Sequence, residues 1–220
     1  MTGKSVLVVA AHPDDEVLGA GGAMARHTQA GDPVSVLILG RGLAAREARP
    51  DFAGLEAECR AALAELGVED VRFEDFPDNA FDTVPLLEVA RAVERVASAV
   101  KPRRIYTHSA TDLNVDHRIA NEAVMIAARP LPGASVAEVF AFEVASATHW
   151  GNDAFRPTAY IDISASLERK LSALACYASE MRPFPHARCI EAQRAQAAWR
   201  GAQVGVAAAE AFETLRIVER

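Results

Sequence analysis

The sequence predicts an α/β fold, namely a Rossmann-like three-layer sandwich with a mainly parallel sheet and additional strands and helices in the C-terminal third. Three observations support this fold class. Short apolar runs rich in β-branched residues have the pattern of buried strands. Segments with apolar residues at helical spacing follow these runs and end at glycine or proline. The two kinds of segment alternate four times, as in βαβ units.

The first half of the chain contains this alternation in order. Residues 5–12 (SVLVVAAH) are a short apolar run, and residues 15–30 carry Val17, Leu18 and Met24 at helical spacing before Gly31. The same reasoning gives strands at 34–39, 71–73 and 103–108, and helices at 55–66, 86–100 and 116–128. In the less regular remainder it gives strands at 136–144, 158–163 and 213–218, and helices at 167–179 and 190–200. We find no repeat or linker, and we therefore predict one domain over residues 1–220.

Composition narrows the class of protein. Half of the residues are apolar and 24% are charged, as in ordinary globular domains. The net charge of −7 argues against a nucleic-acid partner, and the chain lacks a polybasic cluster for an anionic membrane. The N-terminal apolar run is too short for membrane insertion and lacks a signal-peptide layout, so a cytoplasmic location is expected. Cys59, Cys176 and Cys189 form no C-x-x-C pair, and we expect free thiols.

Metal-binding side chains crowd the carboxyl end of the first predicted strand. The run Ala11-His12-Pro13-Asp14-Asp15-Glu16 places four of them within five residues. Ligands of open α/β sheets bind at this end of the strands. His12 and Asp15 are three residues apart across a strand-to-helix turn, so both side chains can point inward. An imidazole nitrogen with a carboxylate oxygen suits zinc and related divalent ions.

A second polar cluster follows the fourth predicted strand and contains His108, Asp112, Asn114, Asp116 and His117. A strand order of 3-2-1-4 makes the first and fourth strands neighbours, and their loops then open a crevice. His117 can thereby reach His12 and Asp15. Two histidines and one carboxylate leave a coordination position for water, as catalytic zinc sites do. Asp14 is left over and can act as general base toward that water.

Each cluster also has a structural interpretation when it is considered alone. Asp14 and Glu16 are typical of a helix N-terminus that exploits the helix dipole. Asp116 and His117 can be the capped start of a helix. The pairing of both clusters at adjacent strand ends favours the metal site. Gly19, Gly21 and Gly22 do not match a dinucleotide fingerprint, because acidic residues occupy the phosphate position; close packing of the helix on the sheet explains them better.

At these residues the chain resembles the PIG-L/LmbE-like family of metal-dependent N-deacetylases. The motif A-H-P-D-D-E is intact at residues 11–16, and a second motif, a run rich in Asp and His that ends in D-H-R, is matched at residues 112–118. Further likeness covers Phe142-Glu143-Val144 with Trp150, residues 160–163, 185–188 and 201–212. The resemblance implies a Rossmann-like fold, zinc held by His12, Asp15 and His117, Asp14 as general base, and Asp116 as a residue that orients a ligand. It also implies small N-acetylated sugar substrates and leaves a homo-oligomer open.

One residue departs from the family pattern. Many members carry a histidine three residues before the metal-binding one, where it serves as acid or oxyanion donor, and here that position is Asn114. Asparagine can donate a hydrogen bond to an oxyanion but cannot transfer a proton. We therefore include Asn114 among the catalytic candidates. The proton is then returned by Asp14, or supplied by His186 or His149.

Further polar residues at the same sheet end are candidate substrate contacts. Arg46, with Arg41 and Arg49, follows the second strand and can bind hydroxyl, carboxylate or phosphate groups. Asp78 and Asn79 follow the third strand and can bind sugar hydroxyls, although a turn explains them equally well. The remaining candidates are Glu143, His149 and His186, with Trp150 as a wall of the pocket or as packing.

The predicted function is removal of an N-acyl group, with acetyl the leading candidate, from an amino sugar or sugar-like metabolite by metal-activated water. The alternative is an amidase that acts on a non-acetyl amide, such as a conjugate of a thiol or an amino acid. A catalytically idle binding protein on the same fold is the third interpretation. Zinc is the expected cofactor, with Fe²⁺ and Co²⁺ also compatible with His/Asp ligands.

Overall fold

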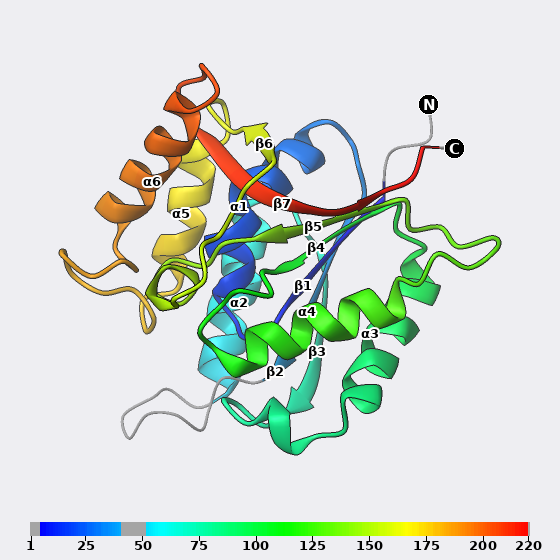
Figure 1. Cartoon of the computed structure of the whole chain (residues 1–220). Helices are drawn as coiled ribbons and strands as arrows, with labels where there is room; N and C mark the ends of the chain where they lie inside the picture. The colour runs from blue at the N-terminus through cyan, green and yellow to red at the C-terminus, as the bar shows by residue number, and fades with distance from the viewer. Residues whose placement is uncertain (1–4, 41–51, 220) are drawn as a thin grey trace.

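The computed structural model describes residues 5–40 and 52–219, and in this part the chain forms one sheet between two layers of helices (Figure 1). The strands are β1 (Val6–Ala10), β2 (Val34–Gly40), β3 (Asp70–Phe76), β4 (Arg104–His108), β5 (Glu138–Phe142), β6 (Ala159–Asp162) and β7 (Ala209–Ile217). The helices are α1 (Asp15–Gln29), α2 (Phe52–Glu65), α3 (Leu86–Val100), α4 (Val115–Ala127), α5 (Leu167–Cys176) and α6 (Ile190–Ala202).

The strand order is β3-β2-β1-β4-β5-β7-β6. The first five strands of that order are parallel, while β7 runs antiparallel between β5 and β6. The predicted neighbours β1 and β4 pair directly, with Val6 opposite Arg104 and Val8 opposite Tyr106. The predicted fold class and the 3-2-1-4 order are therefore confirmed.

Alternation along β1 divides the core into two layers. Val6 and Val8 pack in the cluster that contains apolar residues of α1, α2 and α5. Leu7 and Val9 pack on the other face, in the cluster formed with α3 and α4. All four side chains are fully buried, which is why the strand reads as continuously apolar rather than alternating. Figure 1 shows α3 and α4 together on one face of the sheet.

The glycines of α1 allow this helix to lie close to its neighbours. A Cβ atom at Gly19 would lie 2.2 Å from the Phe142 ring, and one at Gly22 would lie 2.7 Å from Ile163. Both distances are shorter than real Cβ contacts, so only glycine fits at either position. The interpretation of these glycines as packing residues is confirmed.

Two boundaries in the C-terminal third differ from the prediction by three residues or more. Strand β7 begins at Ala209, four residues before the predicted start at residue 213. The charged residue Glu210 interrupts the apolar pattern by which a buried strand is recognised in the sequence. The buried Glu210 carboxylate binds Lys170 and accepts hydrogen bonds from the backbone N–H groups of Gly22 and Ala23. Helix α5 ends at Cys176 rather than at residue 179, and Tyr177 donates its hydroxyl hydrogen bond to Glu16.

Two short 3-10 turns, Phe81–Thr83 and Thr148–Trp150, were not predicted. The three cysteines are free, with Cys59 and Cys189 buried, as the sequence predicts. None of the helices in the described part combines the length and apolar character that a bilayer crossing requires.

Candidate metal centre

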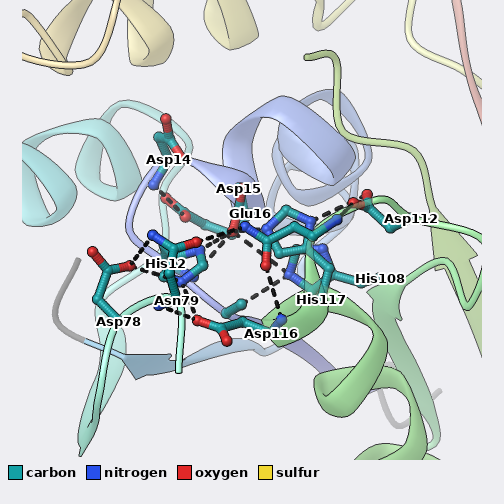
Figure 2. Close-up of polar contacts among 12 residues, drawn as sticks. His12, Asp14, Asp15, Glu16, Asp78, Asn79, His108, Asp112, Asp116 and His117 are labelled. Carbon is teal, nitrogen blue, oxygen red and sulfur yellow. Dashed lines mark hydrogen bonds and ion pairs between the residues drawn. The ribbon is translucent and has the colours of Figure 1, made fainter. Parts of the chain in front are cut away.

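The carboxyl ends of β1 and β4 bring the three predicted metal ligands together (Figure 2). His12 follows β1, Asp15 opens α1, and His117 lies in the first turn of α4. Nδ1 of His12 is 3.3 Å from Oδ2 of Asp15, and Nε2 of His117 is 3.1 Å from the same oxygen. Two imidazole nitrogens therefore converge on one carboxylate, although the two histidines are far apart in the sequence.

In each of the two histidine rings, the second nitrogen, which does not face Asp15, lies close to another carboxylate; we call these the outer nitrogens and the outer carboxylates. Nε2 of His12 lies 2.9 Å from Oδ2 of Asp116 and 3.0 Å from Oδ1 of Asp78. Nδ1 of His117 lies 3.1 Å from Oδ2 of Asp112. Such partners fix the orientation and tautomer of a ligating histidine and make it more basic. Each ring therefore presents its remaining nitrogen to the shared carboxylate.

Hydrogen bonds from neighbouring loops hold these outer carboxylates in turn. Asp116 accepts from the backbone N–H of Asn79 at 2.7 Å and from that of Phe81 at 2.9 Å. Asp112 accepts from the Thr148 hydroxyl at 2.6 Å. The loop after β3 is thereby tied to α4. This geometry supports the interpretation of Asp116 as a residue that orients His12.

The donor set of His12, Asp15 and His117 suits a divalent cation. Oδ1 of Asp15 and Nε2 of His117 are buried, and neither forms a hydrogen bond with any residue that the structure describes. Burial lowers the pKa of His117, but Asp15 and Asp112 outweigh this effect and raise the pKa to about 9. The carboxylates thus stabilise positive charge at this point. Two nitrogen donors and one oxygen donor match the ligands of catalytic zinc sites.

His108 belongs to the cluster but is not available as a ligand through Nε2. This nitrogen accepts a hydrogen bond of 2.8 Å from the backbone N–H of Ala11. The ring stacks on His117 with a centroid distance of 3.9 Å. Burial is the main cause that lowers the pKa of His108 to about 3, so the ring is neutral. His108 therefore holds the backbone directly before His12 and supports the His117 ring.

Asp14 is held differently from its neighbour Asp15. Its carboxylate points away from the two histidines (Figure 2), and Oδ2 accepts a hydrogen bond of 2.6 Å from Nη1 of Arg188. Burial raises the pKa of Asp14 to about 7, although Arg188 opposes this effect. Asp14 also has a backbone φ of 105°, a conformation that non-glycine residues rarely adopt. Such strain costs about 1–3 kcal/mol and is concentrated at functional sites.

A cavity of about 330 Å³ opens beside this cluster. Its lining includes Asn114, Trp150, Arg182, His186 and Arg188. Asn114 caps the helix that carries the second histidine ligand, and Arg188 binds the Asp14 carboxylate. Small-molecule sites typically enclose about 300–1,000 Å³. The cavity therefore has the size of a small-molecule site, and Asn114 and Arg188 connect its wall to the cluster.

The family model described as GlcNAc-PI de-N-acetylase (PIG-L) matches residues 7–128, more than half of the chain. The chain belongs to the PIG-L family. The matched segment includes both polar clusters, so the resemblance seen in the sequence motifs is confirmed.

Individual PIG-L relatives match almost the whole chain. It is 30% identical to the 4-oxalmesaconate hydratase of Pseudomonas putida, over 94% of this chain and 84% of the relative. It is 28% identical to the probable N-acetyl-alpha-D-glucosaminyl L-malate deacetylase 2 of Bacillus cereus, over 89% of this chain and 94% of the relative. A conserved protein of Thermus thermophilus has a structure with a TM-score of 0.80 at 27% identity, covering 98% of this chain and 96% of that one.

Asn114 has a structural function in the candidate metal centre. Its Oδ1 accepts a hydrogen bond of 2.8 Å from the backbone N–H of Asp116 and so caps α4. Its Nδ2 donates to Oδ1 of Asn79 at 3.1 Å. The second hydrogen of that amide group is left for the cavity. The Asn114 side chain is therefore held in place on both sides, and its role as an oxyanion donor stays a prediction.

The predicted substrate contacts lie in different surroundings. His186 lines the cavity, with its ring 6.2 Å from that of Trp150. Asp78 contacts the candidate ligand His12, and the backbone N–H of Asn79 donates to Asp116, the carboxylate that orients His12. Arg46, Arg41 and Arg49 lie outside the described residues. Sugar binding by any of these residues stays a prediction.

Glu143 has partners that leave little room for a substrate. Arg200 of α6 donates to its two oxygens at 2.7 and 2.5 Å, and His149 lies 2.7 Å from Oε2. Burial opposes ionisation, but these partners lower the pKa of Glu143 to about 2. The geometry indicates that Glu143 anchors α6 to the end of β5 and that His149 supports this ion pair.

Sequence reasoning missed Arg188, Arg182 and the role of Asp112. Arg188 belongs to the run Pro185-His186-Ala187-Arg188, but no spacing rule connects this loop to the first strand. Asp112 lies in the acidic run after β4 and could have been recognised as a histidine partner from its position. Arg182 gives no local signal in the sequence.

The strained backbone of Asp14 allows a test by two substitutions that both remove the carboxylate. We expect Asp14→Gly to be more stable than Asp14→Ala by about 1–2 kcal/mol, because glycine adopts positive φ without strain. In a helix or strand the order of the two residues would be reversed. Urea unfolding of both variants at equal metal content measures the difference. An alanine variant as stable as the glycine variant would show that the backbone relaxes.

Proposed function

We propose that this PIG-L protein is a divalent-metal N-deacetylase that acts on a small N-acetylated amino sugar or sugar-like metabolite. The observation that carries the proposal is the convergence of the His12 and His117 nitrogens on Asp15, next to a cavity of substrate size. The deacetylase relative in Bacillus cereus, which matches 89% of the chain, supports the reaction class. Zinc is the metal we propose, on the basis of the donor set.

The protein residues divide the chemistry between them. When bound, a divalent cation supplies Lewis acidity and lowers the pKa of water to near neutrality. Asp14, fixed by Arg188, accepts the proton of the attacking water and returns it to the leaving amine. Asn114 donates its free amide hydrogen to the oxyanion that forms when water attacks the acyl carbonyl. The outer carboxylates keep both imidazoles in the geometry that this sequence of steps needs.

A second candidate function is hydration of a carbon–carbon double bond. It is favoured by the 30% identity to the hydratase of Pseudomonas putida over 94% of the chain. Both reactions begin with addition of water to an electrophilic carbon, so the same base and metal ligands serve either one. They differ in the product, because only the deacetylase releases an amine and acetate.

The experiment that tests the proposal is an amine-release screen over acetylated amino sugars, with and without a chelator. We expect acetate and amine in equal amounts, loss of activity on chelation, and recovery on addition of zinc. The same protein is assayed for loss of ultraviolet absorbance on unsaturated keto acids. Absorbance loss without amine release from any acetylated sugar would reject the deacetylase and favour the hydratase.

A substitution at Asn114 can separate its role as a helix cap from its proposed role as an oxyanion donor. Aspartate caps helices as well as asparagine does, but it has no donor for an oxyanion. We expect Asn114→Asp to lower the unfolding free energy by no more than about 1 kcal/mol, because the cap remains and only the exposed hydrogen bond to Asn79 is lost. We expect kcat to fall by about 10²–10³, as for loss of one oxyanion-hole donor. Steady-state kinetics with metal analysis measures both, and an unchanged kcat would remove Asn114 from the mechanism.

A further inference from the structure

The cavity beside the metal centre contains two arginines with different partners. The Arg188 guanidinium lies 2.6 Å from Asp14 and 3.7 Å from Glu180, so two carboxylates match its charge. Arg182 lines the same cavity, and no carboxylate of the described residues lies within 4.0 Å of its guanidinium nitrogens. Its charge therefore has no protein counter-ion in this part of the chain.

Arg182 is nevertheless held in a fixed position. Its Nη1 donates to the backbone carbonyls of Ser179 at 2.8 Å and Met181 at 3.0 Å. Its backbone N–H donates to the carbonyl of Arg188 at 3.0 Å. One edge of the guanidinium is thus used for anchoring, whereas Nε and Nη2 find no partner among residues 5–40 and 52–219. A guanidinium held in this way keeps donors in the fork geometry that matches a carboxylate.

Other residues that line the cavity suit the uncharged part of a ligand. Trp150 is 59% exposed and meets the His186 ring edge to face, and Leu113, which also lines the cavity, is 55% exposed. An indole face next to polar groups accommodates the apolar face of a sugar ring. The cavity thus combines an aromatic surface, a candidate oxyanion donor and one unmatched cation.

We propose that Arg182 makes this pocket selective for substrates that carry a carboxylate in addition to the group that reacts. The inference rests on the proposed function, which concerns the N-acyl group that reacts. It adds that the substrate carries a carboxylate elsewhere in the molecule. The carboxylate takes the free edge of the Arg182 guanidinium and supplies the missing counter-charge. In a protein of net charge −7, one such cation in the pocket also distinguishes acidic ligands from neutral ones at the site itself.

A binding experiment tests the inference without requiring turnover. Calorimetry with the metal-loaded protein compares D-glucuronate with D-glucuronamide, which have nearly the same shape and differ in charge. We expect the acid to bind about 10–100-fold more tightly, as for a charge-assisted hydrogen-bonded pair. In Arg182→Gln we expect the two affinities to agree within about threefold, with glucuronamide binding unchanged. Arg194→Gln is the matched control, since Arg194 pairs with Glu168 on exposed helix surface.

The same variants are then assayed with N-acetylmuramic acid and its methyl ester. We expect wild type to prefer the acid in kcat/KM, and Arg182→Gln to lose this preference while it keeps its rate on the ester. If neither compound is deacetylated, N-acetylmuramic acid is not a substrate, and the glucuronate comparison alone decides the role of Arg182. Equal binding of both probes by wild type, or equal weakening of both in Arg182→Gln, would overturn the inference.

A second variant covers the case in which Arg182→Gln does not fold. Arg182→Lys keeps the charge and one donor for the backbone carbonyls but loses the fork. We expect it to fold and to lower the preference for glucuronate several-fold, with the glucuronamide affinity unchanged. A preference equal to that of wild type in Arg182→Lys would contradict recognition by the guanidinium.

Discussion

Replacement of His117 by alanine is expected to abolish tight binding of a divalent metal, and with it turnover. The substitution removes one of three donors and leaves Asp15 buried beside a vacated space. Loss of a partner that merely orients a ligand weakens metal binding by about 10–100-fold, so loss of the ligand itself should exceed about 100-fold. The same result is expected for His12→Ala, whose ring faces the same carboxylate at 3.3 Å.

Metal content measured after dialysis against buffered zinc tests this prediction. His27→Ala serves as a control, because this half-buried histidine binds Asp32 and Tyr106. We expect the control to keep its metal, although its stability falls. We expect the metal affinity of Asp112→Asn to lie between those of wild type and His117→Ala. This substitution weakens the partner of Nδ1 of His117 but leaves Nε2 of His117 in place. Wild-type affinity in both His12→Ala and His117→Ala would refute the proposed site.

The sequence was sufficient to predict that His12, Asp15 and His117 lie together, because their positions relative to the strands determine it. His12 and Asp15 follow a continuously apolar strand, and His117 follows another. Parallel strands place their carboxyl ends at one edge of the sheet, so adjacency of β1 and β4 brings these residues together. The remaining requirement was the strand order, for which the alternation of strands and helices already favoured the Rossmann-like arrangement.

The cavity wall could not be predicted by the same rules. Arg182, His186 and Arg188 lie between α5 and α6, in a segment without helical or strand periodicity. Whether such a loop packs against the first strand depends on tertiary contacts, such as the Arg188–Asp14 pair, that no local pattern encodes. Glu143 shows that position at a strand end does not reveal which partners a side chain has in the fold. A carboxylate at a strand end has the position of a site residue, yet Arg200 of α6 binds both of its oxygens.

Replacement of Asp14 by asparagine is expected to separate catalysis from metal binding. Asparagine has the size of aspartate, can still accept from Arg188, and tolerates positive φ better than most residues, so the local fold should remain. It cannot accept a proton from water. We therefore expect full metal content and a fall in kcat of about 10²–10⁴, the range for loss of general-base catalysis.

The measurement combines metal analysis, kcat and KM on one preparation. Because the Asp14 carboxylate points away from His12 and His117, its loss should leave the three metal donors undisturbed. Asp14→Gly then provides a second comparison, since it removes the strain as well as the base and should be equally inactive. Loss of metal in Asp14→Asn would instead make Asp14 a ligand. A kcat within tenfold of wild type would assign the proton transfer to another group on the cavity wall, such as the imidazole of His186.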